Sequence, residues 1–381
     1  MTAVAGNGAG AGGRRKRPKA APARAAPEAP PRPVLSDEEL DALRLALSGK
    51  YFERRADKRL REQLGQALRE GAQAPAMDGP PRRPRLMIAT GATGAGKSRA
   101  LARLIQGFPE LAWSEDRRVR PHVRLSVRGP ATLKSVGLGL LGVLGYPMAP
   151  ETLEHVVWHR VGRHLADAGT RVLVLDEFQN CSSRAKADEA VRIRDTLKSL
   201  LESDDPPIVI ILAGLPEIDG FIGMDKQVLR RARATGFETV EVEDADVVTA
   251  VVAKLAAMVD VAVPDDFGGE IVPRLLHASG GQLGLAIEMS VDAIVNALAP
   301  IGTDEGGGEV RLPPRRGLLL EDYARMYEDR TDNMNFANPF AADDWHLLDP
   351  TLVNVHLPSQ MRPPGGEAAK APAKRRGRGG R

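Results

Sequence analysis

Residues 91–98 read Gly-Ala-Thr-Gly-Ala-Gly-Lys-Ser, and this run constrains the fold more than any other part of the chain. It follows an apolar run from Leu86 to Ala89 and precedes a helical pattern from Arg99 to Gly107. A strand, a glycine-rich turn, Lys-Ser and a helix, in this order, form a P-loop. Glycine allows the backbone to approach a phosphate closely, and the N–H groups of the loop and the first helical turn then point at the anion. The run therefore predicts a nucleotide-binding α/β fold.

The residue types of the run predict individual roles. Lys97 would reach the β- and γ-phosphates, and the hydroxyl of Ser98 would bind Mg²⁺. The expected cofactors are therefore ATP and Mg²⁺. The predicted nucleotide-binding residues are Gly91, Ala92, Thr93, Gly94, Ala95, Gly96, Lys97, Ser98 and Arg99.

A second motif lies well downstream, where the apolar run Val172 to Leu175 ends in Asp176 and Glu177. Such a run predicts a buried parallel strand with its acids at the sheet edge where ligands bind. Asp176 is predicted to hold Mg²⁺, as the acid of a Walker B motif does. Glu177 is predicted to deprotonate the water that attacks the γ-phosphate. A further apolar run, residues 208–214, predicts the inserted strand typical of P-loop ATPases with a catalytic glutamate.

Hydrophobic periodicity predicts the remaining elements. Ser36 and Glu39 form a capping box at the start of a helical segment. The other helices are expected at 131–145, 151–168, 185–203, 246–259, 269–278 and 283–298. The other strands are expected at 123–128 and 237–242. The stretch 303–315 is rich in Gly and Pro and is expected to be a loop.

These elements suggest six segments. They are a disordered basic arm (1–33), an N-terminal helical segment with a linker (34–84), a nucleotide-binding core (85–243), a helical lid (244–302), a C-terminal extension (303–361) and a disordered basic tail (362–381).

Charge is distributed unevenly along the 381 residues. Residues 1–33 and residues 362–381 each carry +6, so the body between them carries −9 against a total of +3. Both ends lack the large apolar residues that would offset the entropy cost of ordering. They are either flexible arms that contact nucleic-acid phosphates or solubilising tails, and composition does not decide between these.

Composition also indicates the cellular compartment in which the protein is expected. The single cysteine, Cys181, argues against a disulfide framework and fits a reducing environment. No secretory signal or membrane span is expected. We expect a cytoplasmic protein.

The order of motifs resembles that of the TniB-type AAA+ ATPases of DNA transposition, relatives of TnsC. The motifs are the P-loop, Leu-Asp-Glu-Phe-Gln-Asn at 175–180, Ala-Gly-Leu-Pro-Glu at 213–217, Asp-Lys-Gln-Val-Leu-Arg-Arg at 225–231 and Asn-Pro-Phe at 338–340. The resemblance implies a parallel five-stranded sheet in the order 5-1-4-3-2 with a C-terminal helical lid. It also identifies Arg231 as an arginine finger for the γ-phosphate bound by a neighbouring subunit.

The resemblance implies an ATP-dependent regulator of transposition, which forms rings or helical filaments on duplex DNA and recruits or activates a transposase or integrase. Contacts to DNA would be independent of sequence, and the candidates are Arg124, Arg128 and Lys134, which are equally compatible with ordinary surface charge. The alternatives are another AAA+ switch, of the ExeA or origin-recognition type, or an ATP-gated scaffold with little turnover.

Two departures from the family pattern suggest slow or partner-stimulated hydrolysis. Leu215 stands where the family has a polar sensor residue, and residues 280–290 contain no arginine for a second sensor.

Overall fold

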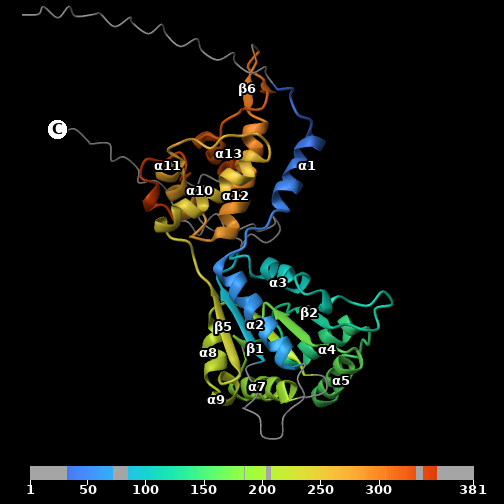
Figure 1. Cartoon of the computed structure of the whole chain (residues 1–381). Helices are drawn as coiled ribbons and strands as arrows, with labels where there is room; N and C mark the ends of the chain where they lie inside the picture. The colour runs from blue at the N-terminus through green and yellow to red at the C-terminus, as the bar shows by residue number, and fades with distance from the viewer. Residues whose placement is uncertain are drawn as a thin grey trace, which may run out of the picture.

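The computed structural model describes residues 32–71, 85–183, 185–202, 207–304, 306–331 and 338–349. They form two units, an α/β core and a helical unit that we call the lid (Figure 1). Most of the predicted arm 1–33 and the whole tail 362–381 lie outside these residues. Arg32, near the end of the arm, donates hydrogen bonds to the carbonyl oxygens of Val259 and Asp260 in the lid.

The core is built on a parallel five-stranded sheet in the order β2-β3-β4-β1-β5, which confirms the order 5-1-4-3-2. All four pairings between neighbouring strands are parallel, so the carboxyl ends of the strands meet at one edge of the sheet. The strands are β1 (Leu86–Gly91), β2 (His122–Ser126), β3 (Val172–Asp176), β4 (Val209–Gly214) and β5 (Ala232–Phe237).

The last strand begins earlier than the sequence suggested. We expected it at 237–242, but β5 ends at Phe237, and residues 238–241 form the connection to the lid. Phe237 to Val242 has the pattern of a strand, but the pairing of Ala232 with Leu86 of β1 sets where β5 begins. Tertiary pairing overrides local pattern here.

Both faces of the sheet are buried, as the nearly continuous apolar strands require. Successive side chains of a strand point to opposite faces. Met87 and Ala89 therefore pack against α2 (Arg55–Gly71) and α3 (Lys97–Gln106), while Leu86 and Ile88 belong to the core on the other face. The helices that contribute to this second face are α4 (Leu133–Leu144), α5 (Glu154–Asp167), α6 (Gln179–Ser182), α7 (Ala187–Glu202), α8 (Glu217–Gly223) and α9 (Lys226–Leu229).

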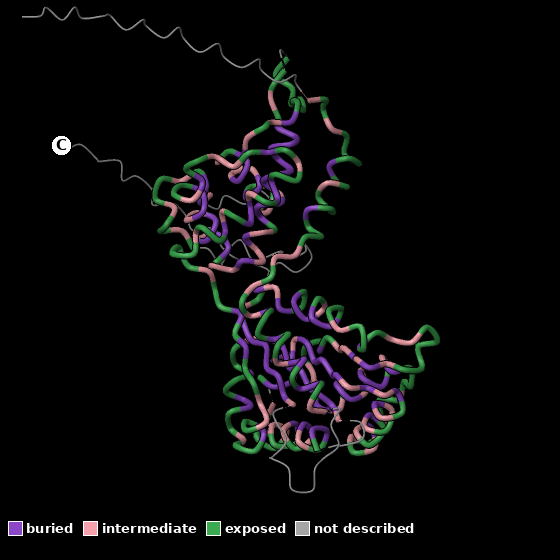
Figure 2. The backbone as a smooth tube through the Cα atoms, in the orientation of Figure 1, coloured by how far each residue is buried: buried purple, intermediate pink, exposed green. Residues whose placement is uncertain are grey.

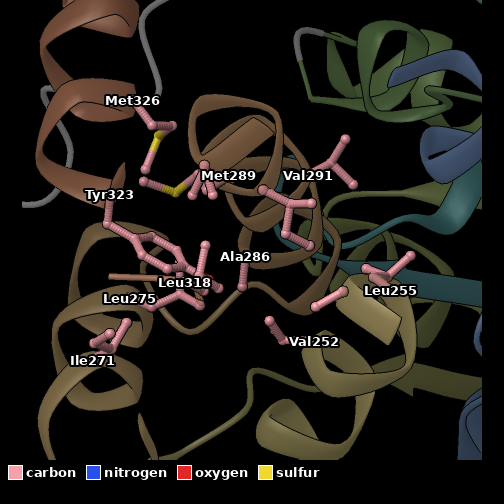
Figure 3. Packing of buried hydrophobic residues seen from close by; sticks show 14 of the residues in the cluster. Val252, Leu255, Ile271, Leu275, Ala286, Met289, Val291, Leu318, Tyr323 and Met326 are labelled. Atoms are coloured by element: carbon pink, nitrogen blue, oxygen red, sulfur yellow. The ribbon is translucent and has the colours of Figure 1, made fainter. Parts of the chain in front are cut away.

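The lid has a separate hydrophobic core, shown in Figure 3. Tyr323, Met289 and Leu275 are fully buried there. Its elements are α1 (Asp37–Ser48), α10 (Ala245–Ala257), α11 (Phe267–Ala278), α12 (Leu283–Leu298) and α13 (Leu320–Thr331). The stretch 303–315, expected to be a loop, contributes to a short hairpin of β6 (Ile301–Thr303) and β7 (Glu309–Arg311). Short 3₁₀ turns lie at Pro109–Leu111, Val242–Asp244 and Trp345–Leu347.

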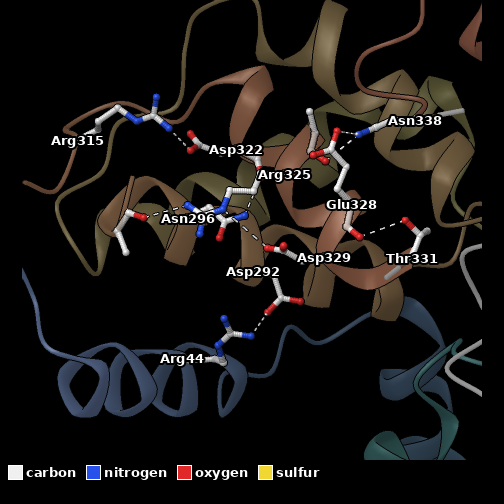
Figure 4. A network of polar contacts seen from close by, with 12 residues as sticks. Arg44, Asp292, Asn296, Arg315, Asp322, Arg325, Glu328, Asp329, Thr331 and Asn338 are labelled. Atoms are coloured by element: carbon white, nitrogen blue, oxygen red, sulfur yellow. Dashed lines mark hydrogen bonds and ion pairs between the residues drawn. The ribbon is translucent and has the colours of Figure 1, made fainter. Parts of the chain in front are cut away.

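Helix α1 packs on the lid although it precedes the core in the chain (Figure 1). Leu40 and Leu47 enter the lid core, and the capping box of Ser36 and Glu39 is formed as expected. Arg44 of α1 forms an ion pair with Asp292 of α12 at 2.7 Å (Figure 4). Helix α2, by contrast, packs on the sheet, so the N-terminal segment is divided between the two units.

The segment after α13 also packs on the lid. Phe340 is buried, with its ring stacked on that of Tyr323 at a centroid distance of 5.3 Å. Asn338 holds the turn, because its side-chain oxygen accepts a hydrogen bond from the backbone N–H of Phe340 and its amide donates to the carbonyl of Ala324. The amide of Asn338 also faces Glu328 of α13 (Figure 4). The Asn-Pro-Phe motif is therefore part of the lid core.

Two stretches of the described chain connect the units, and the backbone tube passes between the units along them (Figure 2). Residues 49–54, which we call the strap, join α1 of the lid to α2 of the core. Residues 238–241 join β5 to the 3₁₀ turn that precedes α10. Within the described residues, no helix combines the length and the apolar character needed to cross a bilayer.

Candidate nucleotide-binding site

The P-loop has the conformation that the glycines of the motif predict. Strand β1 ends at Gly91 and α3 begins at Lys97. Gly94 and Gly96 have φ angles of 83° and 78°, in the left-handed region that favours glycine. Gly91 is required for a different reason, because a Cβ atom there would lie 2.8 Å from the carbonyl oxygen of Phe237. The loop therefore presents its backbone at the carboxyl edge of the sheet, where α/β proteins bind ligands.

Lys97 is buried at the centre of the loop. Its Nζ donates hydrogen bonds to the carbonyl oxygens of Gly91 and Ala92, each at 2.8 Å. Burial lowers the pKa of Lys97, and the carboxylates of Glu177 and Asp176 oppose this shift. An ammonium group held beside anions and partly desolvated is suited to bind phosphate oxygens.

The two acids lie at the end of β3, as predicted for residues that follow a parallel strand. Asp176 is 2% exposed, and its Oδ2 atom accepts a hydrogen bond from Nη2 of Arg124 at 2.6 Å. Its Oδ1 atom accepts a hydrogen bond from the backbone N–H of Glu177. Glu177 has a φ of 57°, which a non-glycine residue adopts at a cost in free energy. Such strain is concentrated at functional sites.

A cavity of about 270 Å³ adjoins the P-loop and is bordered by both units. Lys97, Ser98 and Glu177 line it from the core. Tyr51 and Phe52 of the strap line it together with the first turns of α12, where Leu283 and Ile287 lie. Apolar and aromatic side chains beside a phosphate-binding loop can hold a nucleotide base. No sequence motif predicts that these strap and lid residues line the cavity.

Arg54 of the strap contacts the P-loop directly, although no sequence motif predicts it as a site residue. Its Nη1 donates a hydrogen bond to the carbonyl oxygen of Ala95 at 2.5 Å, and its guanidinium lies 4.6 Å from the centre of the Phe237 ring. Asp57 accepts hydrogen bonds from the backbone N–H of Arg54 and from the hydroxyl of Tyr51. These contacts hold the strap against the loop, and no local sequence pattern predicts them.

The lid meets the P-loop at the start of α12. A Cβ atom at Gly284 would lie 2.5 Å from the carbonyl oxygen of Gly94, so the helix approaches the loop as closely as glycine permits. The side-chain Oε1 of Gln282 is buried and has no hydrogen-bond partner among the residues that the structure describes, and it would lie 2.5 Å from a Cβ atom at Gly94. A larger residue at 284 would push the lid away from the loop.

The residues present fit a magnesium ion as well as a nucleotide. Ser98 is exposed in the first turn of α3 and lines the cavity, and Asp176 has a buried carboxylate at the end of β3, where Arg124 is its present partner. Hydroxyl and carboxylate oxygens are ligands that Mg²⁺ prefers. Ser98 and Asp176 would hold the ion.

Comparisons with known proteins agree with this geometry. Residues 81–222 match the AAA_22 family, described as an AAA domain. The core has the AAA+ P-loop fold. No curated protein matches the chain.

Several solved structures are similar to the chain at low sequence identity. The ORC1 protein of Aeropyrum pernix, solved in complex with DNA, is 16% identical, with a TM-score of 0.49, and the match covers 76% of this chain and 71% of that one. Cdc6p of Pyrobaculum aerophilum is also 16% identical, with a TM-score of 0.48 and coverage of 76% and 70%.

Arg231 lies at the opposite edge of the AAA+ core from its own P-loop. Its carbonyl oxygen accepts a hydrogen bond from the N–H of Leu86, the first residue of β1, whereas the P-loop follows the last. The length of β1 separates the two by about 20 Å. Arg231 is partly exposed and forms an ion pair with Glu202 at 3.1 Å. Its side chain is too short to reach the P-loop of the same chain.

The three candidate DNA contacts lie in different surroundings. Arg124 is paired with Asp176, which gives it a structural partner inside the AAA+ core. Arg128 is exposed after β2, and Lys134 is half-buried in the first turn of α4. Arg99, predicted to bind nucleotide, lines the cavity and donates a hydrogen bond to the carbonyl oxygen of Lys50 in the strap.

Proposed function

We propose that the chain is an ATP-hydrolysing AAA+ switch in which bound nucleotide sets the arrangement of core and lid. The observation that carries this proposal is the cavity itself. One wall is the P-loop with Glu177, and the other walls are the strap and the start of α12. A ligand that fills this space contacts both units, so its presence changes the free energy of their relative arrangement.

The P-loop, Lys97 and Glu177 have different roles in the proposed hydrolysis. The backbone of the P-loop and Lys97 bind the β- and γ-phosphates. Bound Mg²⁺ would neutralise charge on the phosphate oxygens. Glu177 orients a water molecule and accepts its proton, and its position in the cavity wall supports this role.

We propose further that Arg231 completes the site of a neighbouring subunit. Its distance from its own P-loop supports a role between subunits, since only a second copy can bring it to a γ-phosphate. The resulting head-to-tail contact generates rings or helical filaments. Assembly then depends on nucleotide, because ATP forms part of the interface.

Replacing Arg231 with alanine is expected to lower hydrolysis about a thousandfold, since an arginine finger contributes at least this much. ATP binding by the monomer should stay unchanged, because Arg231 is remote from the cavity. Turnover and nucleotide affinity measure the two effects. Arg230→Ala, at the exposed neighbouring position, should cost much less.

A mixing experiment tests the placement between subunits. Arg231→Ala subunits retain Glu177, and Glu177→Gln subunits retain Arg231, so a mixed assembly contains complete sites. We expect partial recovery of hydrolysis on mixing. If no ratio of the two variants restores turnover, Arg231 does not act across an interface.

The biological role that we propose is regulation of DNA transposition, with duplex DNA and a transposase or integrase as partners. The order of motifs and their resemblance to TniB-type ATPases support this role. The Asn-Pro-Phe motif belongs to that resemblance, and in this chain it anchors the C-terminal segment to the lid. The alternatives remain an ExeA-like or origin-recognition-like switch and an ATP-gated scaffold.

Purified wild-type protein tests the proposal directly. With ATP and duplex DNA of unrelated sequences we expect rings or filaments in electron micrographs, together with slow release of phosphate. DNA binding should weaken steeply with salt, because its contacts are to phosphates. A protein that neither binds ATP nor changes its association state would contradict the proposal. An integrase-type gene beside this one would favour transposition over the alternatives.

A further inference from the structure

We infer that Gln179 is the positioning residue of the catalytic base Glu177 and replaces the polar sensor that β4 lacks. The inference rests on the proposed ATPase function. It concerns a side chain that lies in the short helix α6, two residues after the base. Leu215, the residue after β4, has no polar side chain with which to hold a water molecule or a carboxylate.

The amide of Gln179 joins the ends of two strands. Its Nε2 donates a hydrogen bond to Oε2 of Glu177 at 2.6 Å. Its Oε1 accepts a hydrogen bond from the backbone N–H of Leu215 at 3.3 Å. A backbone N–H can only donate, so the amide oxygen must face Leu215 and the amide nitrogen must face Glu177.

The absence of a side chain at Gly214 leaves room for this amide. A Cβ atom at Gly214 would lie 2.0 Å from Oε1 of Gln179, so glycine at the end of β4 is what admits the side chain. Gln179 is 9% exposed. The N–H of Phe178 also donates to the carbonyl of Ala213, which holds α6 against β4. The amide is therefore fixed by packing as well as by hydrogen bonds.

The base needs such a partner. Glu177 has a left-handed backbone and lies in the cavity wall, where a free carboxylate could adopt several rotamers. The hydrogen bond from Gln179 engages Oε2, and Oε1 has no hydrogen-bond partner within the described part of the chain. One oxygen is thus held and the other remains for the attacking water, which reduces the orientational freedom lost at the transition state.

Two substitutions at Gln179 separate positioning from packing. Gln179→Met keeps the approximate shape of the side chain but cannot donate a hydrogen bond. We expect kcat to fall about tenfold with KM unchanged, because loss of positioning should remove only part of the contribution of a general base. Gln179→His changes the shape but restores an N–H donor, and we expect it to recover part of the lost kcat. A packing role predicts the opposite order, with methionine active and histidine impaired.

A third variant displaces the amide of Gln179 without changing this residue itself. Gly214→Ala places a methyl group where the amide oxygen lies, and should reproduce the loss in kcat. Gly220→Ala in α8 is the matched control, because a Cβ atom there meets nothing within 4 Å. Thermal unfolding and ATP affinity show whether the Gly214→Ala protein is folded.

A double-mutant cycle that combines Gln179→Met with Glu177→Gln measures whether the two residues act together, and single-turnover hydrolysis is the measurement. If Gln179 acts through the base, Gln179→Met should cost nothing further once Glu177 is replaced. Additive losses, or wild-type kcat in Gln179→Met, would overturn the inference and leave the ATPase proposal intact. Absence of any turnover in the wild-type protein would overturn both.

Discussion

Replacing Lys97 with alanine is expected to lower ATP affinity at least a hundredfold and to prevent nucleotide-dependent assembly. The side chain of Lys97 is buried, and its Nζ atom donates hydrogen bonds to the carbonyl oxygens of Gly91 and Ala92. When phosphate binds, these N–H groups can turn from the carbonyl oxygens to phosphate oxygens, and each charge-assisted hydrogen bond contributes about 1.5–3 kcal/mol. Fluorescent-nucleotide binding measures the affinity, and light scattering with ATP and DNA measures assembly.

Lys58→Ala is the matched control for Lys97→Ala, because Lys58 is an exposed lysine of α2 in the same unit. It removes the same charge away from the cavity and should leave ATP affinity unaltered. Thermal unfolding of both variants shows whether the core is folded. Filament formation by folded Lys97→Ala protein at wild-type ATP concentrations would remove the P-loop from the mechanism.

Replacing Glu177 with glutamine is expected to lower turnover by about 10²–10⁴-fold, the usual contribution of a general base. ATP affinity should be retained, because the phosphate-binding residues and Asp176 are untouched. ATP-bound assemblies should therefore accumulate and outlast those of the wild-type protein. Phosphate release measures the first effect, and dissociation of assemblies after dilution measures the second.

Glu62→Gln provides the comparison, since Glu62 is an exposed carboxylate of α2 remote from the cavity. Its turnover should equal that of the wild-type protein. Undiminished phosphate release by Glu177→Gln would show that another group accepts the proton. Rapid loss of ATP from the same variant would instead show that the carboxylate contributes to binding.

The predictions that succeeded depend on short-range chemistry. A P-loop needs glycines at fixed positions, because the backbone turns through left-handed φ angles at Gly94 and Gly96. The apolar run before Asp176 can only be a strand buried on both faces. Both the glycine pattern and the apolar run consist of consecutive residues, so they can be recognised in the sequence without knowledge of the fold. The strand order then followed from the resemblance of the motifs.

The predictions that failed or were absent depend on residues distant in sequence. Strand β5 was placed several residues late, because its position depends on pairing with β1. Arg54 and Ala95, 41 positions apart in the chain, are joined by a hydrogen bond that no periodicity anticipates. Arg124 and Asp176 likewise form an ion pair between residues that are far apart in the sequence.

Consecutive residues are enough to specify the phosphate-binding loop and the two acids at a sheet edge, so both could be predicted from short segments of the chain. Contacts between distant segments place α1 on the lid, bring the strap to the cavity wall and join Gln179 to Glu177. These contacts exist because the sheet brings the ends of β1, β3 and β4 to one edge, and because the lid packs on the same edge. Geometry of this kind arises from the packing of whole elements, so no stretch of the chain contains it alone.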